Sequence, residues 1–275
     1  MPSNLRRLAT ERTNPASARI DRQSTRRIVE IINAQDATVA AAVRREVPNI
    51  ARAVDRIVAA LESGGRLFYI GAGTSGRLGC LDASEIPPTF NLPYTTVQGI
   101  MAGGHRALTH ATEASEDDPK LGARDLAKRK LKSRDVVVGI TASGRTPYAI
   151  GALEYARKIG AATIALACNA DPPIARVADV AIVPLTGPEV IAGSTRMKAG
   201  TAQKMVLNIL STAAMIRLGH VYGNYMVNVQ MKNAKLRERG LTILQEVLGI
   251  DRAAARHRLK RSRNDLMRAI HESRS

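Results

Sequence analysis

The fold is decided by residues 67–77, which read Leu-Phe-Tyr-Ile-Gly-Ala-Gly-Thr-Ser-Gly-Arg. The first four are apolar and have the length of a short buried strand. The other residues form a loop of glycines and hydroxyl side chains, and glycine lets a backbone turn tightly and approach a ligand closely. We expect a strand, a tight loop and then a helix, whose N-terminal N–H groups face the carboxyl end of the strand.

The same alternation of short apolar strands and helical patterns continues along the chain. Strands that alternate with helices favour right-handed crossovers, and therefore a largely parallel sheet with helices on both faces. The sequence thus predicts an α/β fold with a five-stranded parallel sheet. The predicted strands are residues 67–70, 95–98, 136–138, 162–166 and 180–183.

A second polar loop, Thr-Ala-Ser-Gly-Arg-Thr at residues 141–146, follows the third predicted strand. Pro147 behind it suits the first turn of a helix. Ligands of parallel sheets bind at the carboxyl ends of strands, and glycines, hydroxyls and helix N-termini together suit an anion. One such loop alone indicates no more than a tight turn, but two at equivalent strand ends predict a phosphate site.

The first loop also matches the dinucleotide fingerprint through Gly71, Gly73 and Gly76. That fingerprint needs an acidic residue roughly 20 positions further on, and no acid occurs between Glu85 and Glu113. The sequence contains no GxxxxGK[ST] motif, and its two cysteines have no set of zinc ligands around them. We therefore expect neither a nucleotide nor a metal cofactor.

Two glutamates are candidates for acid–base chemistry. Glu85 lies in Asp82–Thr89, at the end of the first crossover helix, and Glu116 lies in His110–Asp117, after the second predicted strand. We expect both to overhang the same edge of the sheet, where two carboxylates in different environments can divide acid and base roles. Spacing alone leaves open that either one is a solvated surface residue.

A polar segment, Gly187–Thr201, leads into a long helix that is predicted to begin at Arg196. Ser194 or Thr195 is expected to cap this helix. Arg196 and Lys198 place positive charge near the first turn, where the helix dipole favours an acid. This conflict indicates either an anion facing these side chains or simple exposure to solvent.

The two ends of the chain are predicted to be helical. Ser24 is expected to cap one helix and Asp36 the next, and Pro48 suits the first turn of a third helix that ends at Gly64-Gly65. Near the other end, Gly249-Ile-Asp251 is expected to separate two helices. The sequence thus predicts helical pieces before and after the central α/β region.

Composition sets the class of protein. The 275 residues, 45% of them apolar, suffice for one sizeable α/β domain with a small appendage. Two cysteines are too few for a disulfide framework, so a reducing, cytoplasmic location is expected. The arginines near the N-terminus have no apolar run behind them, so no secretory signal is predicted. The apolar-rich stretch 205–216 is too short and too polar to span a membrane.

The formal charge of +17 lies mostly at the ends of the chain. Residues 1–30 hold seven arginines against three acids, and residues 229–275 hold twelve lysines and arginines against five acids. We interpret the excess as a solvated, arginine-rich surface that also attracts an anionic substrate, and not as a nucleic-acid-binding face. Neither nucleic acid nor a membrane is an expected partner.

Four segments together resemble the N-acetylmuramic acid 6-phosphate etherases, and the last of them also resembles the glucokinase regulatory protein. They are residues 71–77, 82–89, 140–148 and 187–201. The resemblance covers roughly residues 13–260 and implies a flavodoxin-like sugar-isomerase domain that works as a homodimer. With it, the chain divides into an N-terminal helical arm, a sugar-isomerase domain and a small C-terminal helical bundle. The expected bounds are 1–47, 48–228 and 229–275.

The resemblance implies a lyase that acts on an amino-sugar phosphate in the recycling of peptidoglycan. It cleaves the D-lactyl ether of N-acetylmuramic acid 6-phosphate into N-acetylglucosamine 6-phosphate and D-lactate, without a metal or a nucleotide. Glu85 would be the acid that protonates the departing lactate and Glu116 the base. The implied phosphate and sugar ligands are Thr74, Ser75, Ser143, Gly144 and Thr146.

Three other functions are weighed against this one. A non-catalytic sugar-phosphate-binding regulator, like the glucokinase regulatory protein, has two such domains, whereas this chain has room for one. A sugar-phosphate-responsive transcription regulator needs a helix-turn-helix domain, for which residues 1–47 look too short. An aldose–ketose isomerase is the third. The presence of both Glu85 and Glu116 favours the etherase.

Overall fold

The computed structural model describes residues 8–110, 115–229, 231 and 233–272. Its centre is a five-stranded parallel sheet in the order β2-β1-β3-β4-β5, which confirms the predicted α/β fold. The second strand begins two residues later than predicted, and the other strands begin where the sequence placed them. The strands are β1 (Leu67–Gly71), β2 (Val97–Met101), β3 (Val136–Ile140), β4 (Ala162–Leu166) and β5 (Val180–Ile182).

The two loops of the predicted phosphate site start at neighbouring points of the sheet. Strands β1 and β3 are adjacent and are buried along their whole length, as their continuous apolar runs require. Their register pairs Gly71 with Ile140, the last residue of each strand. The loops after residues 71 and 140 therefore leave the sheet side by side.

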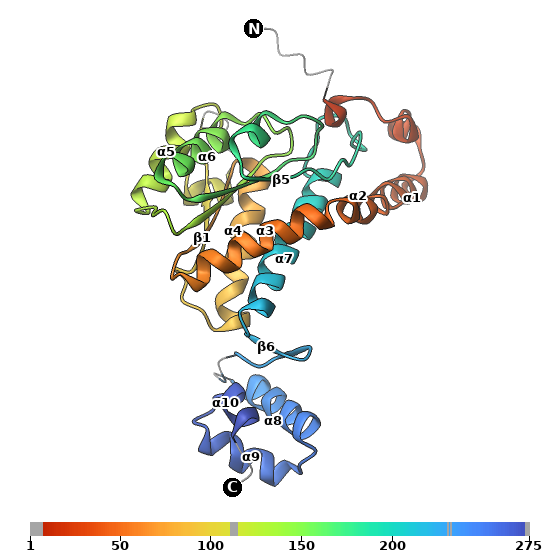
Figure 1. The fold of residues 1–275 in the computed structure, drawn as a ribbon. Coiled ribbons are helices and arrows are strands. Elements are labelled where there is room, and N and C mark those ends of the chain that lie inside the picture. The colour runs from red at the N-terminus through yellow and green to blue at the C-terminus, as the bar shows by residue number, and fades with distance from the viewer. Residues whose placement is uncertain (1–7, 111–114, 230, 232, 273–275) are drawn as a thin grey trace.

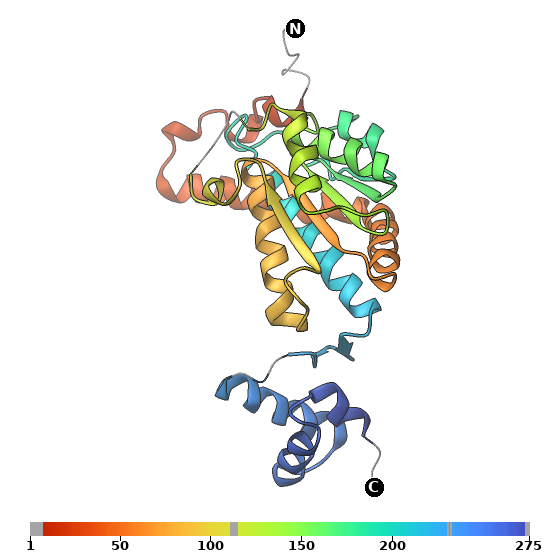
Figure 2. The same ribbon diagram turned by 90° about the vertical axis from the view of Figure 1, so that its left-hand side faces the viewer.

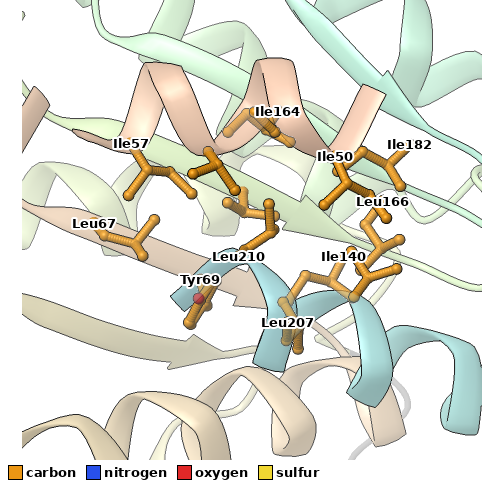
Figure 3. Packing of buried hydrophobic residues seen from close by; sticks show 14 of the residues in the cluster. Ile50, Ile57, Leu67, Tyr69, Ile140, Ile164, Leu166, Ile182, Leu207 and Leu210 are labelled. Carbon is orange, nitrogen blue, oxygen red and sulfur yellow. The ribbon is translucent and has the colours of Figure 1, made fainter. Parts of the chain in front are cut away.

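Helices cover both faces of the sheet, as predicted (Figures 1 and 2). On one face, α3, α4 and α7 pack on alternate strand residues, and Figure 3 shows Ile50 and Ile57 of α3 and Leu207 and Leu210 of α7 in the same apolar cluster as Tyr69. On the other face, α5 and α6 cover the remaining strand positions. These helices are α3 (Val47–Glu62), α4 (Gly73–Phe90), α5 (Pro119–Lys128), α6 (Pro147–Ile159) and α7 (Lys198–Arg217), with 3-10 turns η5 (His105–Leu108) and η6 (Pro173–Val177) between elements.

Helices α4 and α7 lie side by side and run in the same direction (Figures 1 and 2). Near their N-termini the Ser75 hydroxyl donates to Gln203 Oε1 at 3.0 Å. Near their C-termini the rings of Phe90 and His220 lie 6.5 Å apart. Because α4 begins where β1 ends, a residue further along α4 lies further from the carboxyl edge of the sheet.

The N-terminal arm folds back onto the α/β region. The Ser24 hydroxyl accepts from the backbone N–H of Arg27, so the predicted cap of α1 is confirmed. The predicted Asp36 cap is wrong, because Asp36 is the last residue of α1 and the next helix begins after Thr38. The elements of the arm are η2 (Ala9–Glu11), η3 (Pro15–Ser17), η4 (Ile20–Arg22), α1 (Thr25–Asp36) and α2 (Val39–Arg45).

The C-terminal helices form a separate small bundle below the sheet (Figure 1). They have their own apolar cluster, which runs in sequence from Val227 to Ile270. Gly249 ends α8 in the left-handed conformation and the Asp251 carboxylate caps α9, so the predicted break is confirmed. No described helix has both the length and the apolar character needed to cross a bilayer. The elements are β6 (Val221–Tyr222), β7 (Tyr225–Met226), α8 (Ala234–Leu248), α9 (Arg252–Arg261) and α10 (Leu266–His271).

Candidate functional site

The glycines of the first loop are required by close backbone contacts. A Cβ on Gly71 would lie 2.8 Å from the Ile140 carbonyl oxygen, and one on Gly76 would lie 2.5 Å from the Gly71 carbonyl oxygen. Gly73 has a φ of 54°, in the left-handed region. No side chain of the described residues caps α4, whose first N–H groups therefore face the space beyond the strand ends. An anion is stabilised at such a helix start.

A chain of hydrogen bonds joins the second loop to Glu116. The Thr146 hydroxyl donates to Glu116 Oε1 at 3.0 Å, and Thr141 Oγ1 lies 2.8 Å from Thr146 Oγ1. A hydroxyl has one proton to give, so Thr141 must be the donor to Thr146. The Gly144 N–H in turn donates to Thr141 Oγ1 at 3.3 Å. The structure thus places Glu116 against the loop 141–146.

Of the two hydroxyls in this loop that are predicted to bind phosphate, that of Ser143 makes the weaker hydrogen bond within the protein. Its Oγ accepts from the Arg145 N–H at 3.1 Å, and its hydroxyl donates to Thr141 Oγ1 over a long 3.4 Å contact, which is weak enough for a ligand to replace. Thr146 is buried, and its proton is used by Glu116. Gly144 between them has a φ of 75°, and a Cβ there would lie 2.2 Å from the Pro172 Cβ, so this position is restricted to glycine.

The two predicted ligands of the first loop, Thr74 and Ser75, also differ in how free their side chains are to bind a ligand. The buried Ser75 hydroxyl donates to Gln203 Oε1, so the side chain joins α4 to α7. Thr74 is half-buried, with its Cγ2 near Gly200 at the start of α7. Of these two side chains, Thr74 is the one open to a ligand, while Ser75 offers its backbone N–H in the first turn of α4.

Within one chain, Glu85 lies far from the loop of residues 71–77. It is the thirteenth residue of α4, and a rise of 1.5 Å per residue places it about 18 Å along the helix from Gly73. The expectation that both glutamates overhang the same sheet edge is therefore wrong for a single chain. Glu85 is exposed and lines a separate pocket of about 300 Å³ between α4 and α7. The other lining residues are Leu78, Leu81, Asp82, Lys204, Leu207 and Asn208.

A buried acid under this pocket ties the two helices together. The Asp82 carboxylate accepts from Asn208 Nδ2 at 2.8 Å and from the Ser211 hydroxyl at 3.2 Å. Burial raises the pKa of Asp82, and the hydrogen bond from Asn208 opposes that shift. No sequence motif predicted a role for Asn208 or Ser211. The available signal was the presence of polar side chains inside an otherwise apolar helix.

Known proteins share this fold. Residues 49–157 match the model of the glucokinase regulatory protein N-terminal SIS domain, and residues 116–213 match the SIS domain, the sugar-isomerase domain. A phosphoheptose isomerase from Neisseria gonorrhoeae superposes with a TM-score of 0.53 at 17% identity, covering 70% of this chain and 99% of that one. This likeness shows the fold alone.

Full-length relatives identify the family. An N-acetylmuramic acid 6-phosphate etherase from Edwardsiella ictaluri is 57% identical over 98% of this chain and 90% of its own length. One from Symbiobacterium thermophilum is 56% identical over 97% of this chain and 88% of its own length. The chain belongs to the N-acetylmuramic acid 6-phosphate etherase family. The predicted resemblance is thereby confirmed.

In this etherase-family chain, a carboxylate of the same chain caps the start of α7. The buried Glu189 carboxylate accepts from the N–H groups of Lys198 and Ala199, both at 2.9 Å, so the predicted cap by Ser194 or Thr195 is wrong. Burial raises the pKa of Glu189, and these two N–H groups oppose the shift. The Lys198 ammonium itself donates to Gln35 Oε1 at 3.2 Å, and the carboxylates of Glu189 and Asp36 in the same chain act on its charge.

The N-terminal arm of the etherase-family chain reaches the second loop. Asn169, just after β4, donates from Nδ2 to the Ala142 carbonyl oxygen at 3.0 Å and to Thr10 Oγ1 at 3.1 Å. The Thr10 carbonyl oxygen accepts from the Gly193 N–H at 2.9 Å. One buried threonine thus connects the arm, the loop 141–146 and the segment before α7. We found no signal of this role in the sequence.

Proposed function

We propose that this protein cleaves the D-lactyl ether of N-acetylmuramic acid 6-phosphate, releasing D-lactate and N-acetylglucosamine 6-phosphate in cell-wall sugar recycling. The observation that carries the proposal is identity of 57% with an etherase over nearly the full length of both chains. No observation favours the alternative of a non-catalytic regulator. The cytoplasmic location expected from the sequence stays a prediction.

Glu116 is the proposed base. In the open-chain sugar the C1 aldehyde makes the C2 proton acidic, and the base removes it. The electrons of that C–H bond form a C2–C3 double bond as the C3–O bond breaks. The hydrogen bond from Thr146 to Glu116 Oε1 fixes the position of the carboxylate, as a base requires. The same bond holds Glu116 beside the hydroxyls and N–H groups that are proposed to bind the phosphate.

Glu85 is the proposed acid, which protonates the lactate oxygen as it leaves C3. Water then adds its oxygen to C3 and a proton returns to C2, so one water molecule is consumed in all. The chemistry needs only positioned acid and base groups. This role requires Glu85 to meet a sugar whose phosphate is held at a loop about 18 Å away along α4.

We therefore propose a homodimer in which the Glu85 pocket of one subunit faces the Glu116 loop of its partner. Two features of the chain support this arrangement. The first is the separation of the two glutamates within one chain. The second is an apolar rim of the Glu85 pocket, where Leu81 is 51% exposed on the outer side of α4. An exposed apolar side chain beside a pocket suits a subunit contact.

The test is lactate release. Purified protein incubated with N-acetylmuramic acid 6-phosphate should produce D-lactate, whereas the unphosphorylated sugar should react very poorly. In heavy water, elimination should place deuterium at C2 of the product, and labelled solvent oxygen should appear in the sugar and not in lactate. Absence of D-lactate would disprove the function. Equal rates on the two sugars would disprove the proposed phosphate site. Solvent oxygen in lactate without deuterium at C2 of the sugar would indicate direct hydrolysis.

A further inference from the structure

The pocket that holds Glu85 also contains a cation that the proposed acid–base chemistry does not use. Lys204 is an exposed residue of α7 and lines this pocket across from α4. Its ammonium group has no hydrogen bond and no ion pair within 4.0 Å among the residues that the structure describes. Its charge acts on Asp82 only over a longer range. Lys204 is therefore available to an anion that enters the pocket.

The spacing between Lys204 and Glu85 is set by one buried contact. The hydrogen bond from Asn208 to Asp82, 2.8 Å long, joins the two helices. Glu85 lies three residues after Asp82, and Lys204 lies four residues before Asn208. Residues three and four apart are neighbours on a helix surface. Glu85 and Lys204 thus each lie about one helical turn from the hydrogen bond between Asn208 and Asp82, on facing helices.

The leaving group of the proposed reaction supplies a matching anion. In D-lactate the carbon that bears the ether oxygen also bears the carboxylate, so a group that protonates this oxygen must lie close to a negative charge. A cation in the same pocket offsets the repulsion between that carboxylate and Glu85. We infer that Lys204 binds the lactyl carboxylate of the substrate. This inference rests on the proposed function.

The inference predicts a specific loss in a variant. Wild-type protein should prefer the natural substrate over an analogue whose lactyl carboxylate is a neutral primary amide, by about ten- to a hundred-fold in kcat/KM, the range expected for one charge-assisted hydrogen bond. Lys204→Met should lose this preference, mainly through KM for the natural substrate, and should react with the amide as wild type does. Lys204→Arg should keep part of the preference.

The experiment measures N-acetylglucosamine 6-phosphate, which both substrates yield, for wild type, Lys204→Met, Lys204→Arg and Lys158→Met. Lys158 is an exposed lysine near the end of α6 and serves as the matched control. Unchanged preference in Lys204→Met would overturn the inference. So would equal losses on both substrates, which would indicate a structural role.

A binding measurement separates this inference from the proposed function. D-lactate titrated into the protein and followed by saturation-transfer NMR should bind wild type and Lys158→Met, and should bind Lys204→Met much more weakly. If wild type releases no product from either substrate, the proposed function is wrong, and the titration still reports on Lys204. Equal D-lactate binding by all variants would overturn the inference by itself.

Discussion

The two proposed acid–base glutamates lie in contrasting surroundings. Glu116 is half-buried at the carboxyl edge of the sheet and accepts a hydrogen bond from Thr146, in a loop that the N-terminal arm also holds. Glu85 is exposed on α4, has no hydrogen bond among the described residues, and shares its pocket with Lys204. A base must be held in place beside the proton that it removes, whereas an acid must approach the leaving group freely. The surroundings of the two carboxylates suit this division of roles.

The largest expected effects come from neutralising each carboxylate. Glu116→Gln and Glu85→Gln should each lower kcat by about 10²–10⁴, the usual contribution of one acid or base. Substrate binding should persist, because neither substitution removes a proposed phosphate ligand. Lactate release gives kcat, and substrate titration of the inactive variants gives the affinity. Near-normal turnover by either variant would show that its glutamate is a solvated surface residue without a catalytic role.

Mixing the two inactive variants tests whether the two regions come from different subunits. Random dimers of Glu85→Gln and Glu116→Gln chains should recover about a quarter of wild-type activity, because half are mixed and each mixed dimer has one intact site of two. Each variant alone serves as the control. If both glutamates act within one chain, mixing restores nothing.

Two substitutions in the second loop should have different kinetic signatures. Ser143→Ala removes a hydroxyl that is bonded only weakly, to Thr141, and is proposed to bind the phosphate, so substrate affinity should fall by about ten- to a hundred-fold while kcat changes little. Thr146→Val removes the donor to Glu116, so it should lower kcat more than it raises KM. Steady-state kinetics of both variants measure the split. Identical signatures would mean that the two hydroxyls act on the substrate in the same way.

The arm that supports the Glu116 loop should contribute a smaller effect. Thr10→Val leaves one buried proton of the Asn169 amide without its acceptor, which should cost about 1–3 kcal/mol of unfolding free energy and raise KM modestly. Urea unfolding and substrate kinetics measure the two effects. Thr242→Val, at an exposed threonine of the C-terminal bundle, is the matched control. Equal results for both threonines would show that the arm does not support the loop.

The acid beneath the Glu85 pocket should produce the smallest effect, visible as a pH dependence. Burial raises the pKa of Asp82 above its ordinary value of 3.8, so just above that value the folded protein keeps a proton that the unfolded chain has lost. The unfolding free energy should therefore decrease as pH rises through this window. Asp82→Asn should lack this decrease, and Asp55→Asn, at an exposed position, should retain it. Urea unfolding from about pH 4 to about pH 6 measures it.

Much of the architecture follows from local patterns. Four of the five strands were predictable because each is a short, mostly apolar run, whereas β2 contains Gln98 and Gly99 and begins two residues later than predicted. The breaks at Ser24 and Gly249 were predictable because capping depends on nearby atoms. The glycines of both loops were identifiable for the same reason. Family membership was readable from the motifs that these loops contain. These features depend on residues a few positions apart.

The sequence by itself determined the order of strands and helices, the two loops at the sheet edge and the family. Only the tertiary structure decided which polar groups meet. Glu189 replaces the expected caps of α7, Asn208 holds Asp82 across 126 positions of chain, and Asn169 holds Thr10 across 159. It also separated Glu85 from Glu116. The physical reason is that such pairings depend on the register of strands and the packing of whole helices, whereas propensity and spacing act only within one element.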